Sequence, residues 1–380
     1  MNESIWTQAI DRMMLRIDGT AAQVTEGFPH YADPQTGVWS VSPAGDWTGG
    51  FWNGMLWLAY ATGRGEKYLE LALRWTELLR SRIESETVFR GFLFYYGAAL
   101  GEILVDNKAA GDLATLGARG LSTQYNQVAR VIPLGPAAEE AAHVGRGEAN
   151  IDGVPGGTPL LAWAAGRSGD DRLLRIGVAH ALRHIELCVR RDDSVCQSVS
   201  FDPESGDLLR RYTHKGITDD STWTRAQAWA MLGFTTSEIW APGHPELVEA
   251  AMRTADWWID HVPPDLVAYW DFDANPTSQP PRDTSGTAIA AASLLKLSEL
   301  TSDRARRTAY RHHAEATVAE LVSTYLTPTS SEDTRQPGIL TEGCYNNRVD
   351  LATANELIWG DYFLFESLQV LAGNLQPALI

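Results

Sequence analysis

The feature that most constrains this chain is a helix that is apolar nearly all the way round and that recurs six times. The six stretches are rich in small residues and poor in charge, and they span 49–62, 94–105, 156–166, 225–238, 285–297 and 358–371. A helix without a polar face has to be buried on every side. The sequence therefore predicts six helices in the interior of the molecule.

Amphipathic helices are predicted between the apolar ones, at 66–84, 171–190, 246–261 and 302–326. Their single apolar face suits an outer layer that covers the six inner helices. The inner helices recur roughly every 45–70 residues, a spacing typical of a helical-hairpin repeat. Six hairpins closed into a ring form an all-α toroid, and we expect residues 1–380 to make it as one domain. Segment 107–148 fits the repeat least well, and we interpret it as a long loop that could act as a lid.

In such a ring the N-terminal ends of the inner helices gather around one mouth. The segments before those helices are rich in Asp, Trp, Arg, His and Asn, and they span 45–52, 149–157, 214–229, 269–286 and 345–362. Polar residues gathered where the architecture places a pocket indicate an enzyme. The chain also has 14 Trp. Indole faces pack well against sugar rings, although large aromatic side chains can equally fill a helical core.

Asp152 is the candidate proton donor. Ile151 and Val154 flank it, and apolar surroundings favour the protonated carboxyl that a general acid needs. The alternative is an Asp that caps the helix or turn that follows.

A second group of candidates lies in the segment 214–229. Arg225 and Trp229 are one helical turn apart and share a face, so together they could hold a sugar carboxylate. His214, Lys215 and Gln227 lie close by in the sequence. The alternatives are a solvated loop histidine at His214 and an ion pair of Arg225 with an acidic neighbour at 219–220.

Two more tryptophans stand beside carboxylates that could hold sugar hydroxyls. Trp47 follows Asp46, and Trp270 precedes Asp271. Capping of the next helix is an equally good explanation for both carboxylates.

Five stretches together resemble the unsaturated glucuronyl hydrolases of glycoside hydrolase family 88 and the related unsaturated rhamnogalacturonyl hydrolases. They are DWTGGFWNGMLWLAY (46–60), Ile151–Ala164, HKGITDDSTWTRAQAWAMLGF (214–234), the stretch 269–291 and the stretch 343–363. They span nearly the whole chain in family order. The resemblance implies an (α/α)6 barrel, in agreement with the count of hairpins.

The resemblance also implies a reaction. These enzymes act on Δ4,5-unsaturated uronic acids by hydrating an enol ether: an Asp protonates C4, water adds at C5, and the hemiketal expels the remaining sugar. The motif Asp falls on Asp152, as general acid and then base. The motif positions expected to line the pocket are Trp47, His214, Arg225, Gln227, Trp229 and Tyr345.

One stretch departs from the family. The family usually has His-Asp-Leu-Gly-Phe on the second inner hairpin, and here Val88-Phe89-Arg90-Gly91-Phe92 takes its place. The second acid has become Phe89, which makes that wall apolar, and a His near the C-terminus has become Glu342. Arg90 or Glu342 could compensate for the missing acid.

Three hypotheses follow from this departure. The first is a hydrolase of unsaturated uronyl glycosides. The second is a diverged enzyme that uses Asp152 on another sugar or enol ether with a more apolar pocket. The third is a carbohydrate-binding relative without activity.

Bulk properties narrow the partners. A formal net charge of -17 and a pI near 4.9 disfavour nucleic acid and anionic membranes. No apolar run is long enough to span a bilayer, and 1–16 does not read as a signal peptide. Three sparse cysteines favour a reducing compartment, hence the cytoplasm. We expect no metal and no cofactor, a small sugar or oligosaccharide as substrate, and a monomer or homodimer.

Overall fold

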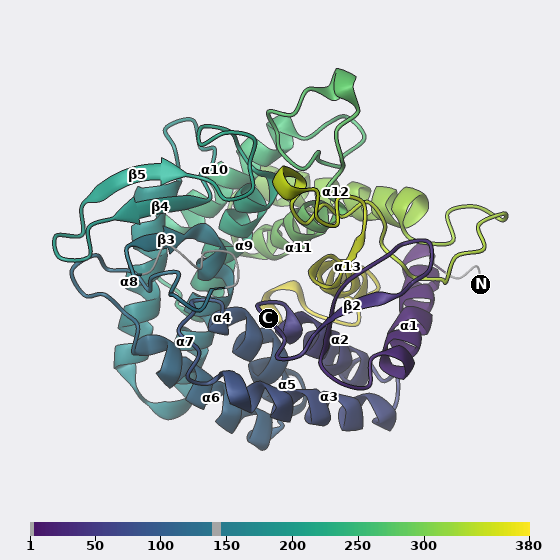
Figure 1. Ribbon diagram of the computed structural model, residues 1–380, viewed down its shortest axis with the longest axis horizontal. Coiled ribbons are helices and arrows are strands. Elements are labelled where there is room, and N and C mark those ends of the chain that lie inside the picture. Colours follow the sequence, from purple (N-terminus) through teal and green to yellow (C-terminus); the bar gives the residue numbers. More distant parts are fainter. Residues whose placement is uncertain (1–3, 139–145) are drawn as a thin grey trace.

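The computed structural model describes residues 4–138 and 146–380, and its helices form two concentric rings (Figure 1). The inner ring consists of α2 (Gly49–Ala61), α4 (Arg90–Phe94) with α5 (Leu100–Val105), α7 (Val154–Ser168), α9 (Thr224–Trp240), α11 (Thr284–Leu300) and α13 (Ile358–Leu371). The outer ring consists of α1 (Ile5–Gln23), α3 (Glu66–Leu78), α6 (Lys108–Ser122), α8 (Asp171–Cys188), α10 (Pro245–His261) and α12 (Arg304–Glu320). This arrangement confirms the (α/α)6 barrel.

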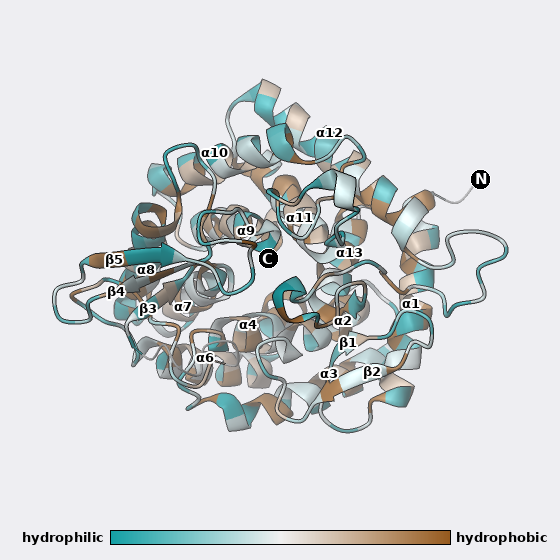
Figure 2. Cartoon of the chain, turned by 45° about the horizontal axis from the view of Figure 1, so that its top comes forward, coloured by the Kyte–Doolittle hydropathy of each residue, from teal (hydrophilic) through white to brown (hydrophobic). Residues whose placement is uncertain are grey.

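The ring closes because the last inner helix packs against the first. α13 contacts both α11 and α2, while α7, α9 and α11 pack on one another in sequence order. The inner helices are buried along almost their whole length, whereas outer helices such as α12 present hydrophilic residues to solvent (Figure 2). Among the described residues, no helix is both long and apolar enough to cross a bilayer.

The inner helix of the second hairpin starts earlier than predicted and is interrupted. It begins at Arg90, and a π-helical turn at Tyr95–Ala99 separates α4 from α5. Gly97 sits in this turn, and a Cβ added there would lie 3.2 Å from the Cα of Gly50 on α2. Glycine at this position therefore lets the first two inner helices approach closely.

The interpretation of 107–148 as one long loop is wrong, because 108–122 forms the outer helix α6. Three glycines weaken its helical pattern, and Gly117 is needed for packing, since a Cβ there would lie 2.2 Å from the ring of Phe94. Residues 139–145 lie outside the described part of the chain, and the predicted lid falls partly on them. The outer helix α1 was not predicted either.

Two small antiparallel sheets connect the hairpins. In the first, β1 (Phe28–Ala32) pairs with β2 (Trp39–Ser42) and β6 (Glu356–Leu357). In the second, β4 (Ser198–Phe201) lies between β3 (Glu148–Asn150) and β5 (Leu208–Tyr212). Asn150 and Tyr212 both pair with Ser198. The chain segments that follow β3 and β5 therefore lie next to Gln197, the residue before β4, at one end of the strands.

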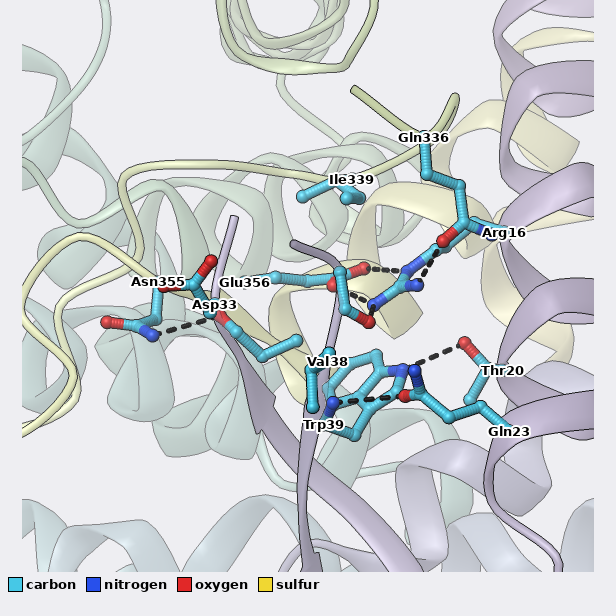
Figure 3. Close-up of polar contacts among 12 residues, drawn as sticks. Arg16, Thr20, Gln23, Asp33, Val38, Trp39, Gln336, Ile339, Asn355 and Glu356 are labelled. Carbon is cyan, nitrogen blue, oxygen red and sulfur yellow. Dashed lines mark hydrogen bonds and ion pairs between the residues drawn. The ribbon is translucent and has the colours of Figure 1, made fainter. Parts of the chain in front are cut away.

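A buried ion pair ties the first sheet to α1 (Figure 3). Arg16 of α1 donates from Nε and Nη2 to the carboxylate of Glu356 on β6, over 2.8 and 2.5 Å. Both side chains are almost fully buried. Trp39 of β2 donates from its indole to Thr20 of α1 over 3.0 Å. These contacts connect the N-terminal and C-terminal ends of the ring.

Candidate active site

A narrow cavity, with about 200 Å³ of space between its atoms but no room for a whole water molecule, lies where the N-terminal ends of inner helices meet. Within residues 4–138 and 146–380, its lining consists of five aromatic side chains, one carboxyl and one amine: Trp47, Phe89, Phe92, Trp223, Trp229, Asp152 and Lys215. A mostly apolar cavity with a few convergent charged groups is the usual form of a small-molecule site.

Asp152 lies in a short 3-10 turn, Ile151–Gly153, between β3 and α7. Its backbone N–H donates to the side-chain oxygen of Asn150 over 2.9 Å, which holds the turn in place. Its Oδ2 accepts a hydrogen bond from Nε2 of Gln197 over 3.3 Å. Only 4% of the residue is exposed, so its carboxyl acts within the cavity rather than as a surface cap.

Lys215 brings a positive charge into the same cavity. It is 2% exposed. Its Nζ lies 4.4 Å from the ring centroid of Tyr345, 5.3 Å from that of Trp223 and 5.7 Å from that of Trp47. Aromatic faces attract a cation in this geometry, most strongly where water is excluded. The lining therefore contains both a buried amine and a buried carboxyl.

The apolar wall is built from aromatic rings that pack at tilted angles. Trp47 lies 6.1 Å from Phe89 and 4.7 Å from Trp359 by ring centroids, and Phe92 lies 5.0 Å from Trp229. Phe89, in the position of the family's second acid, thus packs directly into the aromatic lining. Among the described residues that line the cavity, none places a proton donor at that point of the wall.

The structure brings four of the predicted site residues into the lining: Trp47, Phe89, Asp152 and Trp229. Sequence reasoning missed Phe92 and Trp223, and it weighed Lys215 only as a cation close in sequence to Arg225. The signal was available, because Lys215 and Trp223 belong to the same segment as His214 and Trp229.

His214 and Tyr345 lie beside the cavity. The Nε2 of His214 is 2.5 Å from a carboxylate oxygen of Glu148 on β3. The indole of Trp47 donates to the hydroxyl of Tyr345 over 3.4 Å. Tyr345 therefore connects Trp47 with Lys215 on one side of the cavity.

Arg225 lies behind the wall. Its Nη1 donates to Asp283 over 2.6 Å and to the carbonyl of Cys344, and its Nη2 donates to the carbonyl of Tyr345 over 2.6 Å. Arg225 and Asp283 are both 0% exposed. In the described chain Arg225 contacts protein groups and is not part of the cavity lining.

Three further candidates also lie away from the cavity. Gln227 donates to the carbonyls of Asp193 and Thr254 over 3.2 and 2.9 Å. Trp270 is buried in the core. Arg90 donates to the carbonyl of Ile83 and to Gln124, and it lines a separate surface groove of about 740 Å³. Burial lowers the pKa of Arg90 to about 10.

Two buried histidines on α8 pack below the turn that carries Asp152. The backbone N–H of Ile132 donates to Nδ1 of His180 over 3.0 Å, and Nδ1 of His184 donates to the carbonyl of His180 over 2.7 Å. Burial lowers the pKa of both rings, that of His184 to about 4. Both are therefore neutral near pH 7 and add no positive charge beneath Asp152. In residues 4–138 and 146–380, no three His, Cys, Asp or Glu side chains converge as a metal site would require.

Comparison with known proteins identifies the family. No family model matches the chain. An unsaturated glucuronyl hydrolase of Bacillus sp. strain GL1 is 34% identical over 370 residues, which cover 96% of both chains. This chain belongs to the unsaturated glucuronyl hydrolase family. An unsaturated chondroitin disaccharide hydrolase of Streptococcus pneumoniae is 27% identical over 95% of this chain and 90% of its own.

Solved structures agree with this assignment. The crystal structure of the unsaturated glucuronyl hydrolase of Bacillus sp. GL1 has a TM-score of 0.88 at 33% identity, over 96% of both chains. An unsaturated glucuronyl hydrolase specific for heparin has a TM-score of 0.87 at 25% identity, over 98% of both chains. The resemblance found in the sequence motifs is confirmed, and the chain is a glycoside hydrolase of this family.

Proposed function

We propose that this member of the unsaturated glucuronyl hydrolase family hydrates the double bond of a Δ4,5-unsaturated uronyl glycoside and so releases the aglycone sugar. One observation carries the proposal: Asp152 and Lys215 line the same aromatic cavity. An unsaturated uronic acid needs both a proton donor at its double bond and a cation for its carboxylate. The names of the relatives support the same substrate class.

The reaction adds one water molecule across C4 and C5. Asp152 gives its proton to C4, and positive charge develops at C5 next to the ring oxygen. Water adds to C5, and the Asp152 carboxylate accepts the proton that this water loses. The resulting hemiketal opens and expels the aglycone, so the oxygen of water ends in the uronate-derived product.

The remaining groups bind the sugar or hold the cavity. Lys215 binds the uronate carboxylate, whose charge is better compensated in this buried cavity than in water. Trp47, Trp229 and Tyr345 supply faces and edges for the sugar ring. We assign His214, Arg225, Gln227 and Trp270 to the support of these walls, and we place Arg90 outside the site, in the separate surface groove.

Phe89 favours a second candidate function on the same scaffold. With Phe92 and Trp47 it forms an apolar wall in place of an acid. The substrate would then carry an apolar or uncharged aglycone, or would be a different enol ether that Asp152 protonates. The proton transfer is the same in both candidates, so the aglycone distinguishes them.

We further propose that the chain acts in the cytoplasm as one catalytic unit. Cys188, Cys196 and Cys344 are buried free thiols, which suits a reducing compartment.

The test measures the ultraviolet absorbance of the enol ether while the protein is incubated with each of a panel of Δ4,5-unsaturated uronyl disaccharides. The panel contains charged, neutral and apolar aglycones. The proposal is supported if the absorbance falls with the wild type but not with Asp152→Asn. Asp106→Asn is the matched control, because it makes the same change on the exposed surface, and it should be as active as the wild type. Retention of absorbance on every substrate contradicts it, and turnover only of apolar aglycones favours the second candidate.

A further inference from the structure

Gln197 occupies a position from which it touches both halves of the site. It precedes β4, the middle strand of the second sheet, and is 1% exposed. Its backbone carbonyl accepts the N–H of Ile151 over 3.0 Å. Strand pairing therefore places it between the turn that follows β3 and the turn that follows β5.

The side-chain oxygen of Gln197 is fixed by three donors from the turn after β5. Its Oε1 accepts from the hydroxyl of Thr213 over 2.9 Å, from the N–H of His214 over 2.9 Å and from the N–H of Lys215 over 3.3 Å. Turning the amide by half a rotation would set its NH2 group against these donors. The orientation is therefore determined, and Nε2 must face Asp152.

The donor half of the amide meets the carboxyl of the proposed general acid. Nε2 lies 3.3 Å from Oδ2 of Asp152. A carboxylic hydroxyl is a poorer acceptor than a carboxylate or carbonyl oxygen, so this hydrogen bond favours placing the acidic proton on Oδ1. It also favours the ionised form of Asp152, which must accept a proton late in the reaction.

We propose that Gln197 is a positioning residue that joins Asp152 and the turn of Lys215 into one hydrogen-bonded unit and directs the transferred proton to Oδ1 of Asp152. The acid and the cation are then oriented by a single side chain. The kinetic part of this inference rests on the proposed hydration reaction, whereas the geometric part does not.

Other charged and titratable groups face this unit and stay unchanged in the test. Lys215 lines the cavity, and Glu148 pairs with His214 at the end of β5. His180 and His184 on α8 lie below the turn. The neighbouring Cys196 and burial raise the pKa of the Cys188 thiol, and the charge of Asp152 adds a smaller increase.

The test compares the pH–rate profiles of Gln197→Glu and Gln197→Met with that of the wild type. Gln197→Glu keeps the acceptor for the three donors but sets a second carboxyl against Asp152. It should move the alkaline limb of kcat/KM up by about 1–2 pH units, because the second charge disfavours loss of the Asp152 proton. Gln197→Met lacks the Nε2 donor to Asp152, so its alkaline limb should also move to higher pH, by less than in Gln197→Glu. Its kcat/KM should fall about 10- to 100-fold, because the carboxyl is no longer held in position.

Gln336→Glu is the matched control, since Gln336 is half-buried beside Arg16 and is not part of the cavity lining. Its limb should stay where the wild-type limb is. The inference would be overturned if the alkaline limb of kcat/KM were the same in both Gln197 variants as in the wild type, while unfolding curves showed that both variants are folded.

A measurement without substrate separates this inference from the proposed function. The side-chain carbon of Asp152, labelled with ¹³C and assigned from Asp152→Asn, reports ionisation directly. Its titration should move to higher pH in both Gln197 variants. If the wild type turned over no unsaturated uronyl substrate but this shift appeared, the proposed function would fail and the role of Gln197 would stand. Coincident titrations in wild type and variants would reject that role.

Discussion

Arg225→Met distinguishes a substrate-binding arginine from one that supports the wall. The sequence predicted that Arg225 holds a sugar carboxylate. The structure places its guanidinium 2.6 Å from the carboxylate of Asp283, with both side chains fully buried. If the support role is correct, the substitution acts on stability before it acts on substrate affinity.

The magnitude follows from the charge that the substitution leaves behind. Removing one partner of a buried ion pair costs about 3–5 kcal/mol, because the other charge stays buried without compensation. The carbonyls of Cys344 and Tyr345 lose their donors as well. We expect the free energy of unfolding to fall by about 4 kcal/mol, a roughly thousandfold change in the folding equilibrium.

The assay is equilibrium unfolding in urea, combined with a double-mutant cycle. Asp283 also caps α11 through its Oδ1, and Asn caps a helix equally well. Arg225→Met/Asp283→Asn should therefore recover at least 1 kcal/mol relative to Arg225→Met, since no charge is left alone. A variant Arg225→Met with wild-type stability and a strongly raised KM would refute the reasoning and restore direct carboxylate binding.

Three further predictions follow from the structure. Lys215→Met should raise KM for an unsaturated uronyl disaccharide about 10- to 100-fold and leave the KM of its methyl ester nearly unchanged, because the ester carries no charge for the ammonium to bind; equal effects on both would contradict carboxylate binding. Val88→His/Phe89→Asp should lower the melting temperature, because a carboxyl enters an apolar wall, yet raise kcat/KM for polar aglycones in the absorbance assay; an equal loss on every substrate would contradict the role of that wall in selecting the aglycone. Burial, together with Glu356, raises the pKa of Asp361 well above its usual range, so the native state keeps a proton that the unfolded chain loses. Between about pH 7 and 8, where His180 and His184 are neutral in both the native and the unfolded state, stability should then fall as the pH rises, and Asp361→Asn should flatten that slope in melting curves; an unaltered slope would assign it to other groups.

The inner ring could be predicted well from the sequence, because a helix that is buried on all sides is apolar on all its faces, and this pattern is visible within the segment itself. A helix such as α13 carries no polar face anywhere along its length, and its predicted bounds, 358–371, are those observed. The outer helix α6 is harder to recognise from the sequence, because its glycines, among them Gly117 against Phe94, are needed for packing but are also typical of loops.

The site was predictable where one residue carries the chemistry, and less so where contacts decide the role. Asp152 and Trp47 belong to recognisable motifs and line the cavity. Arg225 belongs to a motif as well, but only the fold shows that Asp283, 58 residues later, faces it. Gln197 carries no local signal at all, because its role depends on strand pairing between β3, β4 and β5.

The central claim is that Asp152 protonates the double bond before the aglycone leaves. A single-turnover experiment tests it by following the enol-ether absorbance and the released aglycone together, with wild type and Asp152→Asn. The account predicts that absorbance falls no later than the aglycone appears, and that Asp152→Asn stops both. Release of the aglycone with the absorbance intact would show cleavage at the anomeric carbon and contradict it.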